Sequence, residues 1–215
     1  MSKTPAKSSS ADFKSQFIEM FGDPKSNPMN WITSSIAEIC DIKSGTTLPL
    51  EKENEGGPVA YIKVADMNLP ENEKYIVTST KHVSYDLAGN GVFKEGTIVF
   101  PKNGAAVATN KKRITKVPTC VDLNTMGVTP TIEIDEQYLY EWFQLLDLDQ
   151  ISMVSAIPQI SARNMGSQII MLPPMTTQRE FASIVEQSDK SKFELNEAIK
   201  DLDAMYKRVI KDNLG

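Results

Sequence analysis

The stretch from Thr177 to Gly215 reads TQREFASIVEQSDKSKFELNEAIKDLDAMYKRVIKDNLG, with no proline and no glycine before its last residue. Its first residues, Thr177-Gln-Arg-Glu180, have the pattern of a capping box, in which the Thr and Glu side chains bind free backbone N–H groups at a helix start. The stretch therefore predicts one helix of roughly 36 residues, about 54 Å long at 1.5 Å per residue.

This predicted helix carries an apolar stripe. From Leu195 onward the apolar residues alternate by four and three positions, which is the heptad spacing of a coiled coil. Packing against its own domain is the weaker interpretation, because so long a helix extends beyond a domain of this size. We therefore expect a coiled-coil-like arm that presents to a partner helix the residues Phe181, Leu195, Ile199, Leu202, Tyr206 and Val209.

The sequence before this arm has a different pattern. From about residue 41 to residue 134 it consists of short β-like runs interrupted by Gly, Pro and Asn. Pro173 and Pro174 separate one more such run from the arm. The predicted strands are residues 59–65, 75–78, 96–100, 105–109, 113–115, 119–123, 128–134 and 168–172.

Short helices are predicted beside these strands. Residues 11–21 carry phenylalanines at four-residue spacing, and Gly22 follows where a left-handed residue ends a helix. Further helices are expected at 34–40 and 136–148. The expected fold class is therefore α+β, a domain of mixed or antiparallel sheet and short helices followed by a long coiled-coil-like helix. Its expected parts are a disordered tail with a short helix and connector (1–30), the main domain (31–174) and the arm (175–215).

Composition excludes several classes of protein. The chain has 215 residues, of which 40% are hydrophobic and 24% charged, an ordinary globular balance. No apolar run is long enough to cross a bilayer, and the first residues lack the apolar stretch of a secretory signal. Two cysteines and one histidine are too few for a thiolate or histidine metal cluster. We expect a cytoplasmic protein with no membrane segment and no structural metal.

Signatures of catalysis are missing from the sequence as well. It contains no Gly-rich nucleotide loop, no nucleophile elbow and no Asn/Asp-Pro-Pro-aromatic motif of DNA methyltransferases. The nuclease-like Asp-x-Lys pattern occurs at residues 41–43 and again at 12–14, which indicates a chance match. We therefore expect no catalysis by this chain alone and no cofactor.

Charge is unevenly distributed along the chain. The net charge is −5, yet the segment from Pro101 to Val121 contains cations and no acid. Such a segment is either a solvated hairpin edge, whose lysines prevent strand-to-strand aggregation, or a surface that contacts phosphates. The charge alone supports both interpretations equally. The cations are Lys102, Lys111, Lys112, Arg113 and Lys116.

Several segments follow one another in a distinctive order: FIEMFGDP at 17–24, NPMNW at 27–31, IKSGTT at 42–47, YIKVAD at 61–66, GTIVFPKNG at 96–104, IPQIS at 157–161 and IMLPP at 170–174. In this order and spacing, and followed by a long helix, they resemble the DNA specificity subunit of type I restriction–modification enzymes. Each segment is unspecific alone, but together they cover nearly everything from Phe13 onward.

The resemblance implies a target recognition domain that reads one half of a split DNA sequence. It also implies a long helix that sets the distance to a second recognition domain and docks modification subunits. In that family the modification subunits methylate adenine with S-adenosylmethionine and a restriction subunit cleaves DNA with ATP, so this chain would hold neither cofactor. A full specificity subunit has two recognition domains and two long helices. This sequence has one of each, and therefore looks like a half subunit, natural or truncated.

For this role the resemblance and the local chemistry together predict the residues that contact DNA. Hydroxyl and amide side chains read bases, and cations bind phosphates. Gly104 permits close backbone approach, whereas the loop at 43–47 is equally well explained as a plain turn. The predicted DNA-contacting residues are Lys43, Ser44, Thr46, Thr47, Lys63, Lys102, Asn103, Asn110, Lys111, Lys112, Arg113 and Lys116.

Two function classes stay open on the sequence. The first is a non-catalytic DNA-binding specificity subunit, and the second is a solitary protein-interaction module that binds or redirects modification subunits. Since the family's machinery acts on two half-sites, a chain with one recognition domain is expected to form a two-fold homodimer through antiparallel C-terminal helices. Such a dimer reads an inverted repeat.

Overall fold

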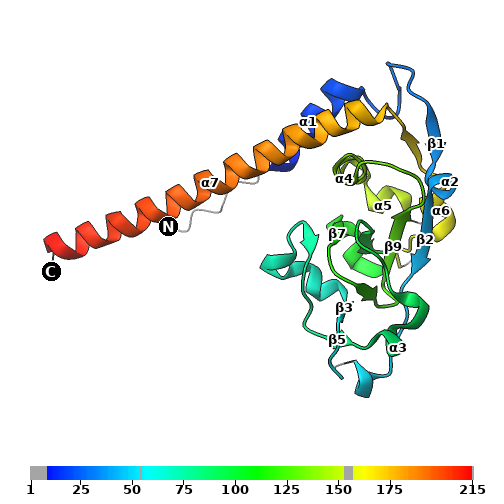
Figure 1. Cartoon of the computed structure of the whole chain (residues 1–215), viewed down its shortest axis with the longest axis horizontal. Coiled ribbons are helices and arrows are strands. Elements are labelled where there is room, and N and C mark those ends of the chain that lie inside the picture. The colour runs from blue at the N-terminus through cyan, green and yellow to red at the C-terminus, as the bar shows by residue number, and fades with distance from the viewer. Residues whose placement is uncertain (1–8, 54, 153–156, 215) are drawn as a thin grey trace.

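The computed structural model describes residues 9–53, 55–152 and 157–214, and the predicted tail before Ser9 lies outside them. Figure 1 shows an α+β domain from which one long helix projects, so the predicted fold class is confirmed. The strands are β1 Thr33–Ser35, β2 Cys40–Ser44, β3 Val59–Ile62, β4 Tyr75–Ile76, β5 His82–Val83, β6 Ile98–Pro101, β7 Arg113–Thr115, β8 Thr119–Val121, β9 Thr125–Pro130 and β10 Ile169–Met171. The α-helices are α1 Ser9–Phe21, α2 Ile36–Ile39, α3 Tyr85–Ala88, α4 Glu136–Leu145, α5 Leu148–Ile151, α6 Ala162–Gly166 and α7 Met175–Leu214.

Small sheets make up the domain. The largest has five strands in the order β2-β9-β6-β7-β4, antiparallel except for the parallel edge pair β7 and β4. A second sheet has the order β5-β3-β8, and β1 pairs with β10 at the root of α7. The loops that connect the strands of the five-stranded sheet therefore lie at its two ends.

Aromatic side chains join α1, α4 and the root of α7. Phe17 stacks on Tyr138 with ring centroids 5.3 Å apart and meets Phe181 edge-on at 5.6 Å. All three side chains are completely buried, and each contributes about 1.5–3 kcal/mol to folding. As predicted, α1 is followed by a left-handed glycine. Gly22 has a φ of +81°, and a Cβ there would lie 2.5 Å from Cγ of Pro28.

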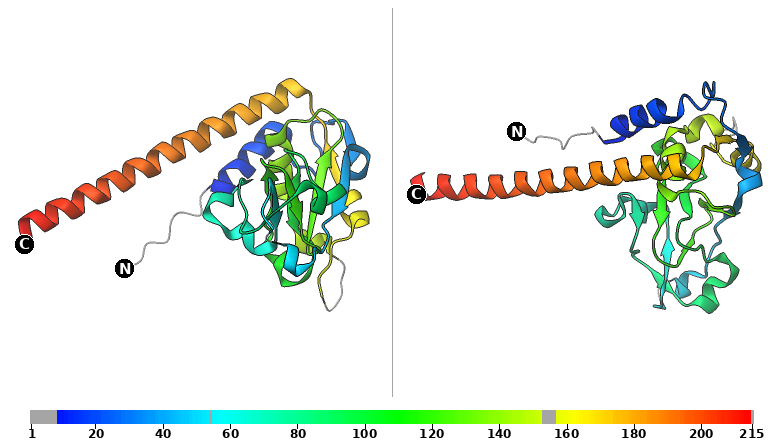
Figure 2. Two further views of the ribbon diagram at one scale, coloured as in Figure 1. Left: turned by 60° about the horizontal axis from the view of Figure 1, so that its bottom comes forward. Right: turned by 45° about the horizontal axis from the view of Figure 1, so that its top comes forward.

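The long helix α7 has 40 residues and a length of about 60 Å. Near its start Phe181 and Val185 are fully buried, whereas the side chains from Phe193 to Ile210 are all exposed. Figures 1 and 2 show the far part of this helix extending past the domain. Within the described ranges, no helix combines the length and the apolarity that crossing a bilayer requires.

The start of α7 differs from the prediction. The helix begins at Met175, so the predicted capping-box residues lie inside it. Gln178 N donates to Pro174 O at 3.1 Å, which closes the first turn at a proline that has no N–H of its own. The Gln178 side chain then ties the arm to the domain, since its Oε1 accepts from Asp135 N at 3.0 Å and its Nε2 donates to Pro173 O at 2.8 Å.

Two other predicted elements are wrong. Residues 105–109 belong to a 3₁₀ helix rather than a strand, because Val107 is its one buried side chain and the left-handed Asn110 ends it. Residues 34–40 do not form one helix. They form the end of β1, the single turn α2 and the start of β2, with Glu38 accepting a hydrogen bond from the backbone N–H at the start of α2.

Candidate nucleic-acid interface

Loops meet at one end of the five-stranded sheet. The C-terminal ends of β2 and β6 lie beside the N-terminal ends of β9 and β7, because these neighbours are antiparallel. The edge strand β4 starts at the same end, since it is parallel to β7. We name this region the sheet-end surface; it comprises residues 43–47, 102–104, 110–113, 122–124 and 157–160.

Backbone hydrogen bonds extend the sheet into this surface. Lys102 N donates to Asn124 O, and Ile160 N donates to Lys102 O, both at 2.8 Å. Gly104 N donates to Pro158 O, also at 2.8 Å, and Gly104 has a φ of +69°. The segment after β6 therefore lies between the turn at Asn124 and the segment at 158–160, and its hydrogen bonds to both hold its backbone in place.

The loop after β2 is held as tightly. Gly45 N donates to Thr125 O and Thr46 N donates to Val121 O, both at 3.0 Å. A Cβ at Gly45 would lie 2.1 Å from Asp122 O, so only glycine fits at this close approach. A rigid loop of this kind can hold hydroxyls and a cation against DNA. Its exposed side chains are Lys43, Ser44, Thr46 and Thr47.

Lys112 does not reach the surface, so its predicted DNA contact is wrong. The side chain is completely buried, and Nζ donates to Asn110 Oδ1 and Leu146 O, both at 2.7 Å. The Leu146 carbonyl lies there because α4 ends at Leu145, earlier than predicted. Burial lowers the pKa of the amine to about 7. Asn110 Oδ1 also accepts from Leu148 N at 2.9 Å, so this carbonyl serves the fold rather than a base.

Lys102 is nearly buried, and Arg113 is partly exposed but has its guanidinium engaged within the fold. The Arg113 guanidinium donates to Met67 O and to Lys112 O, both at 2.9 Å. Burial lowers the pKa of this guanidinium. Lys102 is only 9% exposed. The structure therefore corrects the prediction for Arg113, whose terminal nitrogens bind backbone carbonyls.

Two other predicted cations are neutralised by acids. Lys63 Nζ lies 2.7 Å from Glu53 Oε1, and this contact raises the pKa of the lysine. Lys116 lies at the opposite end of β7, where Nζ is 2.8 Å from Glu136 Oε1 and 3.1 Å from Glu95 Oε1. These ion pairs make both lysines poor phosphate ligands.

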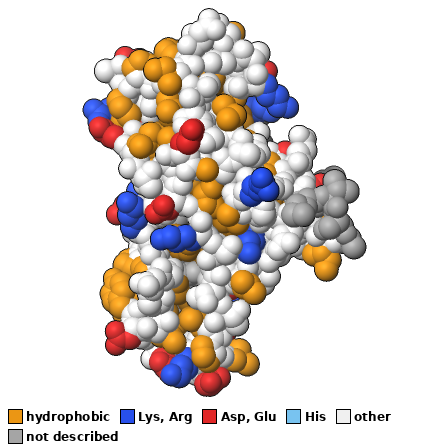
Figure 3. All heavy atoms as spheres, turned by 90° about the vertical axis from the view of Figure 1, so that its right-hand side faces the viewer, with side chains coloured by type: hydrophobic (Ala, Val, Ile, Leu, Met, Phe, Trp, Pro, Cys, Tyr) orange, Lys and Arg blue, Asp and Glu red, His pale blue; other side chains and the backbone are white. Residues whose placement is uncertain are grey.

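The accessible part of the prediction is therefore the loop at 43–47 together with Asn103 and Lys111, which are both partly exposed. Two residues that the prediction missed lie beside them: Asn103 Nδ2 is 3.4 Å from Asn124 Oδ1, and the Asn103 backbone pairs with Gln159. The IPQIS segment contained the signal for Gln159, whereas nothing in the sequence marked Asn124. Figure 3 shows one face of the molecule, where Lys and Arg side chains lie across the middle, with Asp or Glu side chains beside some of them and hydrophobic groups between them.

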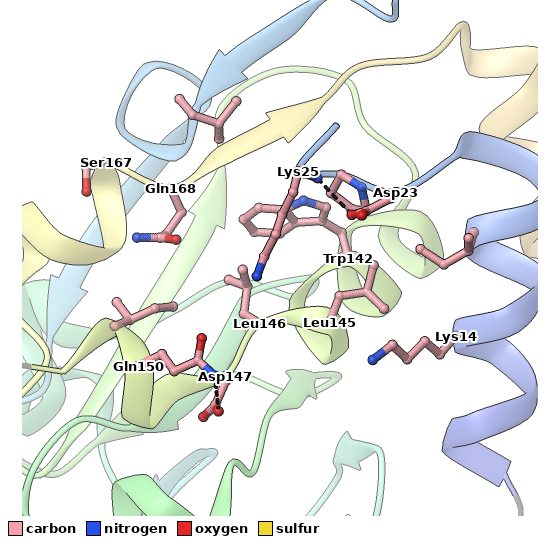
Figure 4. A pocket seen from close by; sticks show the side chains of 14 residues that line it. Lys14, Asp23, Lys25, Trp142, Leu145, Leu146, Asp147, Gln150, Ser167 and Gln168 are labelled. Carbon is pink, nitrogen blue, oxygen red and sulfur yellow. Dashed lines mark hydrogen bonds between the residues drawn. The ribbon is translucent and has the colours of Figure 1, made fainter. Parts of the chain in front are cut away.

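A separate groove of about 1150 Å³ lies between α1 and the domain. In Figure 4, Lys14 extends toward the groove from α1, and Lys25 extends into it beside Trp142, which forms part of its wall. Asp23 and Asp147 line it too, so its charge is mixed. None of the predicted DNA-contacting residues lines this groove, which makes it distinct from the sheet-end surface.

Groups with possible nucleophilic or metal-binding chemistry are sparse. Among the residues that the structure describes, no cluster of three or more His, Cys, Asp or Glu is placed to hold a metal ion. Cys40 and Cys120 are buried, and burial raises their thiol pKa values to about 12 and about 11. Both thiols therefore stay protonated at neutral pH and act as packing groups.

The fold is similar to solved structures from type I restriction–modification systems. A chain from a structure of complex assembly and conformational transition of the type I R-M system matches with a TM-score of 0.73 and 18% identity, over 94% of this chain and 50% of that chain. The HsdS subunit from Thermoanaerobacter tengcongensis matches with a TM-score of 0.65 and 19% identity, over 89% and 46%. The S subunit from M. genitalium matches with a TM-score of 0.58 and 18% identity, over 95% and 52%.

These likenesses concern the fold, because the identities are low, and this chain spans about half the length of the solved chains. The sequence adds an independent match. The sequence model of the protein family described as the type I restriction modification DNA specificity domain matches residues 28–202, which is most of the chain. The chain therefore belongs to the type I restriction–modification DNA specificity family.

Proposed function

We propose that this chain is a half-size DNA specificity subunit that acts in the cytoplasm. It binds double-stranded DNA and directs the modification and restriction subunits of a type I system to one target. The observation that carries this proposal is the sheet-end surface, where fixed loops display hydroxyl and amide side chains beside Lys43 and Lys111. Such groups can read base edges while the cations hold the phosphate backbone. Catalysis is assigned to the partner subunits, so the chain needs no cofactor.

Co-expression with a type I modification subunit tests this function. The host should lack its own type I system, and its DNA is then sequenced for methylated adenine. The proposal predicts methylation at one sequence motif, absent when the chain is omitted and reduced when Lys43 and Lys111 are both replaced by alanine. Replacing Lys14 and Lys25 of the groove is the matched control. A stable complex that methylates no defined motif would favour the protein-interaction module instead.

We also propose that two copies pair through α7. At the root of this helix α1 covers the heptad stripe: Phe181 is buried, and Lys192 Nζ lies 4.3 Å from the centre of the Phe13 ring. Farther along, the same four-and-three spacing continues without cover. Each of these side chains is 48% to 67% exposed: Leu195, Ile199, Leu202, Tyr206 and Val209. Burying them against a second helix would contribute about 1.5–3 kcal/mol for each large apolar side chain.

An antiparallel second copy fits the length of stripe that is left. Helix α1 itself runs antiparallel to α7, since Phe13 lies near Lys192 and Phe21 lies near Phe181. The uncovered stripe is centred on Leu202. With a two-fold axis there, Val209 of a second copy would lie opposite Leu195, just beyond Lys192, which contacts Phe13 of α1. On this proposal α1 and the partner helix occupy consecutive parts of one stripe, and the two domains lie at opposite ends.

A further inference from the structure

Two exposed apolar side chains lie on the sheet-end surface. Leu123 is 50% exposed and Ile157 is 67% exposed. They flank Asn103, whose Nδ2 donates to Leu123 O at 3.4 Å and whose backbone pairs with Gln159 on the other side. Single exposed apolar residues are ordinary on a protein surface. These two, however, border the amides that we propose contact DNA.

The turn that holds Leu123 uses its other polar groups to fix itself. Asp122 Oδ1 accepts from Thr125 Oγ1 at 2.9 Å and from Asn124 N at 3.2 Å. Asp122 Oδ2 accepts from Asn124 Nδ2 at 3.2 Å, and Asn124 O accepts from Lys102 N at 2.8 Å. The neighbours of Leu123 are thus engaged within the fold, and Leu123 is what the turn displays.

An exposed leucine adds little to such a turn. Turns favour Asn, Asp, Ser, Gly and Pro for backbone reasons, and leucine offers none of them. Half of the Leu123 side chain stays in solvent, so the fold gains little burial from it. Its charge surroundings suit DNA, because Lys43 and Lys111 lie on the same surface while the acid beside it, Asp122, is hydrogen-bonded within the turn.

We propose that Leu123 and Ile157 contact thymine methyl groups in the major groove and thereby select thymine at defined positions of the target. The 5-methyl group is the one apolar feature that distinguishes a base edge in that groove, and apolar side chains read it by contact. This inference rests on the proposed function. It adds apolar readout to the polar groups at Asn103 and Gln159.

The test uses the full-length protein and a library of randomised DNA duplexes. The wild-type protein first selects its preferred duplexes from the library. Three variants, Leu123→Ala, Ile157→Ala and the remote control Ile32→Ala, then select duplexes from the same library in parallel. Ile32 is 77% exposed and lies beside β10, away from the sheet-end surface. We expect the preference for thymine to relax at one position of each half-site in each of the first two variants and to stay unchanged in the control.

A methyl-deletion cycle makes the assignment specific. Each selected thymine is replaced by deoxyuridine, which lacks only the methyl group. Wild type should lose about fourfold in affinity at the contacted position, and the matching alanine variant should lose nothing further. Thermal melting confirms that the variants are folded.

The outcomes of these selections distinguish a failure of the proposed function from a failure of this inference. A wild type that selects no sequence overturns the proposed function, and this inference falls with it. A wild type that selects a motif, while both variants keep the same thymine preferences and the same response to deoxyuridine, overturns the inference alone. Equal weakening on all duplexes also overturns it, because that result indicates apolar contact without base choice.

Discussion

Lys111 and Lys112 are adjacent in sequence and opposite in surroundings. Lys111 is partly exposed and touches Asn68, whereas Lys112 is sealed inside and bonded to Leu146 O. The sequence predicted a local cluster of cations, and a count of charges cannot distinguish these two lysines. The difference arises from the end of α4, which lies far away in the chain and offers Lys112 a carbonyl.

The two lysines should therefore respond differently to substitution. Lys111→Ala should leave the free energy of unfolding within about 0.5 kcal/mol and flatten the salt dependence of DNA affinity by roughly one unit of slope. Lys112→Met should leave that slope unchanged and lower the free energy of unfolding by about 1–3 kcal/mol, because Leu146 O loses its donor. Denaturant titration and fluorescence anisotropy with a duplex of unrelated sequence measure the two quantities. If a folded Lys112→Met variant showed a flatter salt dependence of DNA affinity, Lys112 would contact DNA, which contradicts the structural role assigned to it.

Glu141 makes the stability of the fold depend on pH. Its carboxylate is buried and accepts from Gln137 Nε2 at 2.7 Å, and burial raises its pKa to about 7. Between about pH 4.5 and pH 7 the folded state holds a proton that the unfolded state releases. The free energy of unfolding should therefore fall as pH rises through this range, by roughly 3 kcal/mol.

Glu141→Gln removes this titration and keeps a hydrogen-bonding amide at the site. The variant should match wild type near pH 5 and be the more stable protein near pH 8. Denaturant titrations at both pH values measure the difference. If the free energy of unfolding depends on pH equally in wild type and variant, Glu141 does not cause that dependence.

At the scale of elements, the sequence predicted those parts whose signals are long or periodic. The helix α1, the strand β7 and the arm all follow from local patterns. Residues 105–109 looked like a strand because they are small and apolar, yet tertiary packing buries Val107 alone and selects a 3₁₀ helix. The capping-box pattern predicted that α7 starts at Thr177, but the helix starts directly after Pro174.

The loop after β2 should depend on its glycine. Gly45→Ala places a Cβ 2.1 Å from Asp122 O, so the loop must shift, and we expect a loss of about 1–3 kcal/mol in stability together with weaker DNA binding. Gly91→Ala is a matched control, since its Cβ would meet only Thr46 Cγ2 at 3.8 Å. Denaturant titration and anisotropy compare the two. If both variants behave alike, the close packing of this loop does not matter.

The arm should pair with itself near Leu202. Leu202→Cys brings two thiols within one helical turn in the antiparallel dimer, and mild oxidation should link the chains. Ala204→Cys lies outside the heptad seam and should give little product. The native cysteines, Cys40 and Cys120, are buried and should not compete. Denaturing gels without reductant show the linked species; equal linkage in both variants, or none, would exclude this register.

For the whole molecule, the proposed pairing of two copies would give a two-fold arrangement of recognition domains. The chain spans about half of the solved specificity subunits that it resembles, and it carries one long helix of 40 residues. The sequence motifs led to the expectation of a half subunit, which stays a prediction. The sequence could not predict which end of the sheet displays the loops, because strand order and register arise only when distant strands pair.

The most direct measurement is selection from a library of randomised duplexes by the purified full-length protein. If two copies each read one half-site through the sheet-end surface, sequencing should recover an inverted repeat with a fixed spacer, and Lys43→Ala with Lys111→Ala should weaken its recovery. Recovery of no common sequence, at a protein concentration where the chain is folded and dimeric, would contradict the account.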